Sequence, residues 1–277
     1  MSGVAQRLER SRGELRLEFK RRGPQSTLAG LYQDGCLKAR LPRRYGPVPE
    51  AVCINTSGGI ADGDSLQTTV ACQAGACAIV SGQAAERVYR SREGAGQISA
   101  TLSLEDGAKL AWLPQETILF DGGRLVRTID ARLRGSASLL AVESTILGRT
   151  AMGESVYAGS LSERWRIEID DRLAYIDAFA LDDTDIARQI RRPAILNGCI
   201  AFATAIYVGR DAAAVLDCLR QLDEAANCVR GASRMDSIVV TRFASTSGQA
   251  LRAAVQAVVS TVTESYDGMY VPKVWTL

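Results

Sequence analysis

The sequence predicts a mainly β protein: a single domain of layered β-sheets with two helices in its C-terminal third. Apolar side chains alternate with polar or small ones over many short segments, which is the pattern of half-buried strands. Only two segments have the i, i+3, i+4, i+7 spacing of an amphipathic helix, and both lie late in the 277 residues. No linker or break in composition marks a boundary, so residues 1–277 are expected to form one domain.

Two pairs of strands are the clearest elements, and each pattern predicts a hairpin. Apolar residues alternate with polar or small ones over 98–104, a turn follows at 105–107, and an apolar stretch begins over 110–113. Alternation recurs over 164–169, where Asp170-Asp171-Arg172 then turns the chain back into another apolar strand. The same pattern predicts further strands at 67–72, 76–81, 117–120, 129–133, 138–146, 200–208 and 237–243.

The two helices each have a residue suited to cap the first turn. Asp211 precedes the first helix, over 212–222, whose apolar face carries Val215, Leu216, Leu219 and Leu222. Ser247 precedes the second helix, whose apolar face carries Leu251, Ala254, Val255, Val258, Val259 and Val262.

The composition is that of a soluble globular protein. The chain is 47% hydrophobic and 23% charged, with a net charge of +2. No segment approaches the ~20 apolar residues that a membrane-spanning helix requires. The first ten residues are charged, so no secretory signal is expected. Seven cysteines form no CxxC pair, which favours reduced thiols and a cytoplasmic location.

Histidine is absent from the chain, and this excludes several kinds of site. Ser-His-Asp and Cys-His catalysis both need an imidazole to carry the proton. Imidazole is also the commonest ligand for zinc, copper and nickel. A metal ion would have to be held by carboxylates, backbone carbonyls or thiolates, and more loosely. The sequence therefore favours passage of a metal ion over its storage, with no tightly bound metal and no cofactor.

A glycine-rich loop ends in two aspartates, in the run GGIADGD over 58–64. The loop lacks the GK[ST] of a phosphate-binding loop, and its aspartate spacing does not match a calcium loop. One interpretation is a tight turn in which glycines adopt positive φ. The other is that Asp62 and Asp64 line a polar channel.

Further polar residues stand where strands are predicted to begin or end. Gln83 and Glu86 follow one such strand, where an ion-paired surface turn is the alternative. Glu116, next to Gln115, leads into a strand that should be buried. A buried carboxylate costs several kcal/mol unless it is paired or solvated, so Glu116 requires an arginine or a water-filled cavity. Arg149 and Glu154 are candidates to pair with each other or with Glu116, as a structural salt bridge.

Charge is segregated along the chain. Residues 1–45 contain eleven Lys and Arg against four Asp and Glu, whereas 168–185 contain seven acids and one arginine. The protein is nearly neutral and the basic segment has few aromatics, which argues against nucleic-acid binding. Charged patches of this kind steer and orient protein docking. A solvated exterior is the alternative for either patch taken singly.

Several segments, in this order, resemble the urease accessory protein D family, also called H in some organisms. They are NTSGGIADGD at 55–64, QAAERVYR at 83–90, WLPQETILFDGG at 112–123 and GRTAMGE at 148–154, followed by ERWRI at 163–167 and VPKVW at 271–275. The resemblance covers nearly the whole chain. Asp62, Gly82 and Lys273 depart from the residues that are usual for the family.

The resemblance implies a cytoplasmic maturation chaperone with no catalytic step of its own. Family members bind apo-urease and recruit accessory protein F, which holds the nickel-carrying GTPase G, while accessory protein E supplies nickel. This chain has no nucleotide motif, so GTP hydrolysis is expected on the partner. The candidate residues for a nickel path, or for structural polar contacts, are Asp62, Asp64, Gln83, Glu86, Gln115, Glu116, Arg149 and Glu154.

Two other classes of function are compatible with the sequence. A carboxylate-dependent glycoside hydrolase needs no histidine, because two acids about 5–10 Å apart across a cleft suffice. Glu116 with Glu86 or Asp64 would supply such a pair. The other alternative is a structural scaffold with no path for metal.

Overall fold

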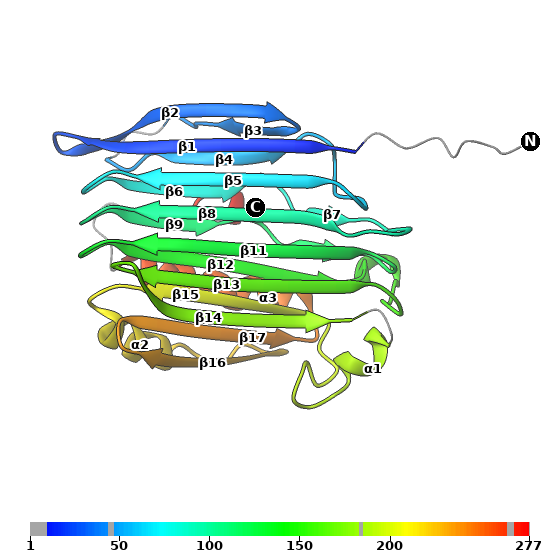
Figure 1. The fold of residues 1–277 in the computed structure, drawn as a ribbon. Helices are drawn as coiled ribbons and strands as arrows, with labels where there is room; N and C mark the ends of the chain where they lie inside the picture. The colour runs from blue at the N-terminus through cyan, green and yellow to red at the C-terminus, as the bar shows by residue number, and fades with distance from the viewer. Residues whose placement is uncertain (1–9, 44–46, 183–184, 265–268, 277) are drawn as a thin grey trace, which may run out of the picture.

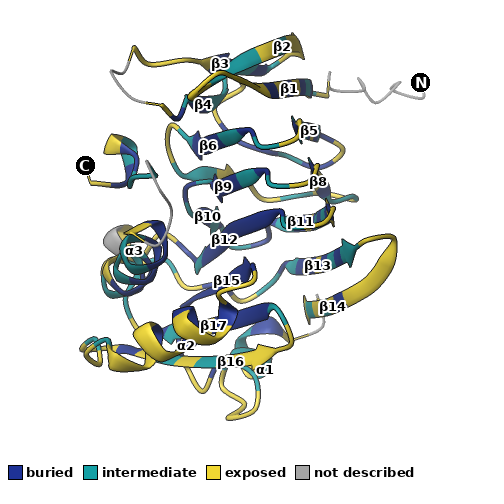
Figure 2. Ribbon diagram, turned by 90° about the vertical axis from the view of Figure 1, so that its left-hand side faces the viewer, coloured by how far each residue is buried: buried dark blue, intermediate teal, exposed yellow. Residues whose placement is uncertain are grey.

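Two β-sheets lie face to face, and helices cover the outer face of one of them (Figures 1 and 2). This arrangement comes from a computed structural model that describes residues 10–43, 47–182, 185–264 and 269–276. Parts of both charged segments, and most of the charged N-terminus, lie outside the described residues. The fold class predicted from the sequence, layered sheets with helices in the C-terminal part, is confirmed.

The first sheet has seven strands and the second has ten. The seven-stranded sheet has the order β14 (Arg172–Leu181), β13 (Ser160–Ile169), β11 (Arg124–Leu133), β8 (Gly96–Leu104), β5 (Ser65–Cys72), β1 (Arg12–Arg22) and β2 (Gln25–Gly35). The ten-stranded sheet has the order β16 (Cys228–Met235), β17 (Ile238–Ser245), β15 (Ala201–Val208), β12 (Ser138–Leu147), β9 (Lys109–Leu113), β6 (Cys77–Gly82), β4 (Glu50–Asn55) and β3 (Leu37–Arg40). Its two short strands, β10 (Thr117–Leu119) and β7 (Glu86–Val88), continue from β12 in parallel pairing.

From β4 to β13 the chain crosses repeatedly from one sheet to the other. Consequently β5, β8, β11 and β13 are paired in parallel in the first sheet, and β4, β6, β9 and β12 in the second. The hairpin predicted over 98–113 is therefore wrong, because β8 and β9 lie in different sheets. The turn at Glu105-Asp106-Gly107 leads across the sandwich. Alternation gives the same signal for a strand that pairs with its sequence neighbour and for one that faces it.

The second predicted hairpin is confirmed. β13 pairs antiparallel with β14, from Leu161 opposite Leu181 to Ile169 opposite Arg172. Asp170 and Asp171 both have positive φ, 49° and 61°, in the turn. Two successive positive φ values are what a two-residue hairpin turn requires, because that turn matches the twist of the strands.

Helices α2 (Ala212–Gln221) and α3 (Gly248–Glu264) cover the ten-stranded sheet (Figure 2). The Ser247 hydroxyl accepts a hydrogen bond from the Ala250 backbone N–H at 3.3 Å, so its predicted cap is confirmed. Asp211 precedes α2, but its carboxylate accepts from the Tyr207 hydroxyl and makes no side-chain cap bond. A short helix, α1 (Ile186–Ile190), and two 3₁₀ turns, η1 (Thr150–Met152) and η2 (Lys273–Trp275), complete the fold.

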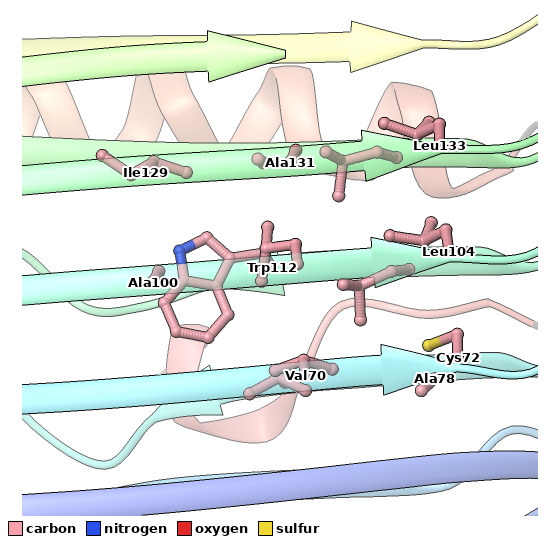
Figure 3. Packing of buried hydrophobic residues seen from close by; sticks show 14 of the residues in the cluster. Val70, Cys72, Ala78, Ala100, Leu104, Trp112, Ile129, Ala131 and Leu133 are labelled. Carbon is pink, nitrogen blue, oxygen red and sulfur yellow. The ribbon is translucent and has the colours of Figure 1, made fainter. Parts of the chain in front are cut away.

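The main core fills the space between the sheets. Figure 3 shows part of this layer, including Val70, Leu104, Trp112 and Leu133. A second core lies between the ten-stranded sheet and the helices. β12 contributes to both cores, which explains its nearly continuous burial. Among the described residues, no helix combines the length and the apolar character that crossing a membrane requires.

Candidate functional site

A cavity of about 220 Å³ lies between the two sheets beside β6, β7 and β10. Three of the residues singled out in the sequence, Gln83, Glu86 and Gln115, line it. Arg127 and Glu143 line it as well. Most of the lining is apolar, and these five polar side chains come from β7, β11, β12 and the loops that follow β6 and β9.

Glu86 is linked to the glycine-rich loop through Asn55. Its Oε1 accepts a hydrogen bond from the Asn55 amide at 3.0 Å, and the same amide donates to the Gly59 carbonyl at 3.3 Å. Burial raises the pKa of Glu86, and the Asn55 hydrogen bond only partly offsets that effect. A carboxylate in this setting gains from any cation that enters the cavity.

Gly59 allows the loop to pass close to β7. Its φ is +148°, and a Cβ there would lie 2.4 Å from Cε2 of Tyr89 and 2.8 Å from the Arg87 carbonyl oxygen. Only glycine fits that conformation and that space. The loop is therefore a tight structural turn beside the cavity.

Asp62 and Asp64 bond to the chain around the loop, and neither lines the cavity. Asp64 accepts from the backbone N–H groups of Ser11 and Ala61, both at 2.7 Å. Asp62 forms an ion pair with Arg10 at 3.0 Å. Backbone hydrogen bonds, first that from Glu93, lower the pKa of Asp62. The contacts of both aspartates correspond to the turn interpretation of this loop.

The Glu116 carboxylate pairs with Arg252 of α3. Arg252 donates to its two oxygens at 2.7 and 3.0 Å, and to the Gln115 side-chain oxygen at 2.7 Å. Both Gln115 and Arg252 also donate to the Val274 carbonyl, at 2.9 and 3.0 Å. The sequence required an arginine or a cavity for Glu116; the structure supplies the arginine and ties α3 to the C-terminal segment.

Arg149 and Glu154 pair with each other. The guanidinium donates to both carboxylate oxygens at 2.8 and 2.9 Å, and lies 4.4 Å from the Phe120 ring centroid. The hydrogen bonds from Arg149 lower the pKa of Glu154 to about 2. This is the structural salt bridge that the sequence offered as one alternative, and neither residue lines the cavity.

A buried ionic cluster was not anticipated from the sequence. Arg127 of β11 is 2% exposed and bridges Glu143 of β12 and Glu163 of β13. The indole N–H of Trp112 donates to Glu143 at 3.0 Å, and that of Trp165 donates to Glu163 at 2.7 Å. We call Arg127, Glu143 and Glu163 the buried triad.

A signal for the triad was present in the sequence. Arg127 occupies the inward register of β11, between Leu125 and Ile129, where an apolar residue is usual. Glu143 directly follows the apolar run from Leu139 to Val142, and all five residues are buried. Burial raises the pKa of Glu143, an effect that the nearby Arg127 only partly reverses. Charged residues at core positions of predicted strands would have identified the cluster.

The donor set of the cavity determines which ions it could hold. No group of three or more Cys, Asp or Glu suited to a metal ion occurs among the described residues. Cys53 lines the cavity, but burial raises the pKa of its thiol to about 12, so it remains protonated and a poor ligand. Oxygen ligands remain, and these bind a transition metal more weakly than imidazole or thiolate.

Comparisons with known proteins assign a family. The family model described as "UreD urease accessory protein" matches residues 11–276. "Urease accessory protein UreD" of Agrobacterium fabrum is 38% identical over 271 residues, covering 98% of this chain and 93% of that protein. The protein of the same name from Rhizobium leguminosarum bv. trifolii is 39% identical over 277 residues, covering 100% and 99%. "Urease accessory protein UreD 1" of Brucella abortus biovar 1 is 36% identical over 278 residues, covering 100% and 97%.

Proposed function

The chain belongs to the UreD urease accessory protein family, whose role is in urease maturation, and from that premise we propose that it helps to insert nickel into urease. It does so as a non-catalytic scaffold that binds apo-urease together with accessory proteins F and G. GTP hydrolysis takes place on protein G, and protein E supplies the nickel.

The observation that carries the nickel part of this proposal is the cavity between the sheets, whose lining includes the carboxylates of Glu86 and Glu143. Gln83 lines it as well, whereas the Gln115 side-chain oxygen accepts from Arg252, so the available ligands are carboxylate and amide oxygens, and histidine is absent from the chain. Such ligands attract Ni²⁺ but release it readily, because nickel prefers imidazole nitrogen. Weak, exchangeable binding suits an ion in transit to a tighter site in urease.

The docking part is supported by where the charges lie. The Lys and Arg of the basic segment lie largely on β1 and β3, beside the edge strand β2, which has none. The acidic segment includes β14, which forms the opposite edge of the seven-stranded sheet from β2. Several acids near β14 are already paired, among them Asp177 with Arg242 at 2.7 Å. Docking at the basic edge should therefore depend more steeply on salt, since exposed charges are screened beyond about 8–10 Å.

The hydrolase alternative requires two carboxylates facing one cleft. Glu86 faces the cavity, but Glu116 is bound by Arg252 and Asp64 by two backbone N–H groups. The pairings of Glu86 with Glu116 or with Asp64 therefore have no support in the geometry.

The test is urease matured in cells that express the urease operon with tagged variants of this chain. Glu86→Gln should leave recovery of the complex unchanged and lower the nickel content per urease active site. The matched control is Glu154→Gln, an acid outside the cavity. Equal nickel contents for both variants would count against transit through the cavity. Separate elution of this chain and urease at every salt concentration would refute the scaffold itself.

A further inference from the structure

A second cavity lies on the other side of the buried triad. It measures about 410 Å³ and is lined by Glu163, Phe179, Phe202, Thr204 and Arg242, among others. Val229, which is 74% exposed, also lines it, so this cavity reaches the surface near β16. Glu143 therefore borders the first cavity and Glu163 the second, and Arg127 bonds to both carboxylates.

The strand register places the two cavities on one line across the sandwich. In the seven-stranded sheet, Ile98, Arg127, Glu163 and Phe179 are paired neighbours on β8, β11, β13 and β14. In the facing sheet, Glu86, Thr117, Thr145 and Phe202 are paired neighbours on β7, β10, β12 and β15. Both rows run from the first cavity to the second, perpendicular to the strands, with the triad between them.

The guanidinium of Arg127 closes this line. Its Nε donates to Glu163 at 2.9 Å, and its Nη1 lies 3.0 Å from Glu143. Nη1 also donates to the Thr117 hydroxyl and Nη2 to the Thr145 hydroxyl, both at 2.9 Å. The side chain is thus held from both sheets, and it lines the first cavity while its partner Glu163 lines the second.

The charges of the triad do not balance when both acids are ionised. One buried guanidinium faces two buried carboxylates, and charge interactions in a protein interior are far stronger than in bulk solvent. A cation that reaches either cavity is attracted by the same two carboxylates that hold Arg127. Such an ion competes with the guanidinium for its ligands.

We propose that Arg127 is a displaceable plug in a single passage through the sandwich, and that a divalent cation opens it by competing for Glu143 and Glu163. The choice of a divalent cation rests on the proposed function; the plug itself rests on the two cavities and the triad. Entry from one side leads past Glu86 to Glu143, and exit leads past Glu163 to the opening near β16.

Tryptophan emission provides a measurement on the purified chain without urease. The indoles of Trp112 and Trp165 bond to Glu143 and Glu163, one on each side of the plug, so bound Ni²⁺ would quench both. Trp275 lies in η2 and donates its indole N–H to the Leu113 carbonyl instead of to a triad carboxylate, so it is expected to contribute a constant background. The probe is Ni²⁺ alone, titrated into native protein and variants whose circular dichroism is native.

Arg127→Gln should lower the Ni²⁺ concentration that gives half-maximal quenching by about tenfold, a usual size for coupling between competing ligands. Arg127→Lys, which keeps the charge but cannot span both acids, should give a smaller shift in the same direction. Arg149→Gln, an arginine outside the passage, is the matched control and should not shift it. Combining Arg127→Gln with Glu143→Gln should raise the Ni²⁺ concentration for half-maximal quenching again, because one of the two carboxylates is lost.

Unchanged quenching in both Arg127 variants would overturn the proposal, and if Arg127→Gln fails to fold, Arg127→Lys alone decides. The result is separable from the proposed function. The expected quenching shifts together with normal nickel content in urease matured by Arg127→Lys would retain the plug and reject nickel transit through it.

Discussion

Glu116 accepts hydrogen bonds from Arg252 at 2.7 and 3.0 Å, and this contact joins the loop before β10 to a helix 136 residues further along the chain. Arg252 donates to the Gln115 side chain and the Val274 carbonyl as well. One guanidinium therefore fixes three separate segments around the cavity wall.

Glu116→Ala should lower the free energy of unfolding by about 1–3 kcal/mol, because it leaves a partly buried guanidinium without its carboxylate. Arg252→Ala should cost a similar amount, and the double variant should cost less than the sum of both. Urea unfolding of the four proteins measures this. Strictly additive losses would show that the contact contributes nothing. If Glu116 acts through structure, nickel content per recovered complex should stay normal.

As the pH increases, the native protein should lose stability through the ionisation of Glu86, and the Glu86→Gln variant should not. The free energy of unfolding of the variant should therefore rise relative to that of the native protein. The folded-state pKa of Glu86 is raised by burial, so its stabilising contribution is full below its unfolded pKa and is lost as the pH rises through the folded value. Urea unfolding at pH 4 and pH 8 should thus show that the free energy of unfolding of the variant, relative to the native protein, is higher at pH 8 than at pH 4. The exposed acid Glu224, changed to Gln, is the control. A difference that is constant with pH would contradict the assignment.

Asp64→Asn should destabilise the glycine-rich loop by about 1–3 kcal/mol, because an amide cannot accept from both the Ser11 and Ala61 N–H groups. Asp34→Asn, on an exposed edge strand, should change stability by less than about 0.5 kcal/mol. Thermal melting of both variants gives the comparison. Equal melting temperatures would mean that Asp64 does not hold the loop.

Gly59→Ala should cost more than Gly58→Ala, although both glycines have positive φ. A Cβ at Gly59 meets Tyr89 and the Arg87 carbonyl within 3 Å, whereas a Cβ at Gly58 meets no atom within 4 Å. We expect about 1–2 kcal/mol at Gly58, from backbone strain alone, and more at Gly59. Chemical denaturation of both variants tests this, and the reverse order would be inconsistent with the loop geometry.

The positions of the strands in the sequence were more predictable than the pairing between them. The segments predicted at 67–72, 117–120 and 200–208 match β5, β10 and β15 to within two residues at each end, because alternation reports burial on one face. β1 was read only as part of a basic segment, yet Leu15, Leu17 and Phe19 alternate inward between its charges. Pairing was harder: the same alternation gave the correct hairpin for β13 and β14 and the wrong one for β8 and β9.

The candidate site residues were likewise predictable in position but not in their contacts. Gln83, Glu86 and Gln115 line one cavity, whereas Asp62, Asp64, Glu116, Arg149 and Glu154 hold loops through ion pairs or backbone N–H groups. Sequence spacing identifies polar residues at strand ends but not the direction in which each side chain points. Arg127 was overlooked because a single charge within a strand is normally exposed.

By itself, the sequence determined the β-rich class, the two amphipathic helices and the lack of imidazole chemistry, since these depend on residue type and local periodicity. Only the tertiary structure decided that successive strands cross between two sheets, that Arg252 reaches Glu116, and that Arg127 stands between two cavities. Those facts depend on contacts between residues far apart in the chain. Local propensity carries no record of such contacts, because the side chains meet only when both sheets have formed.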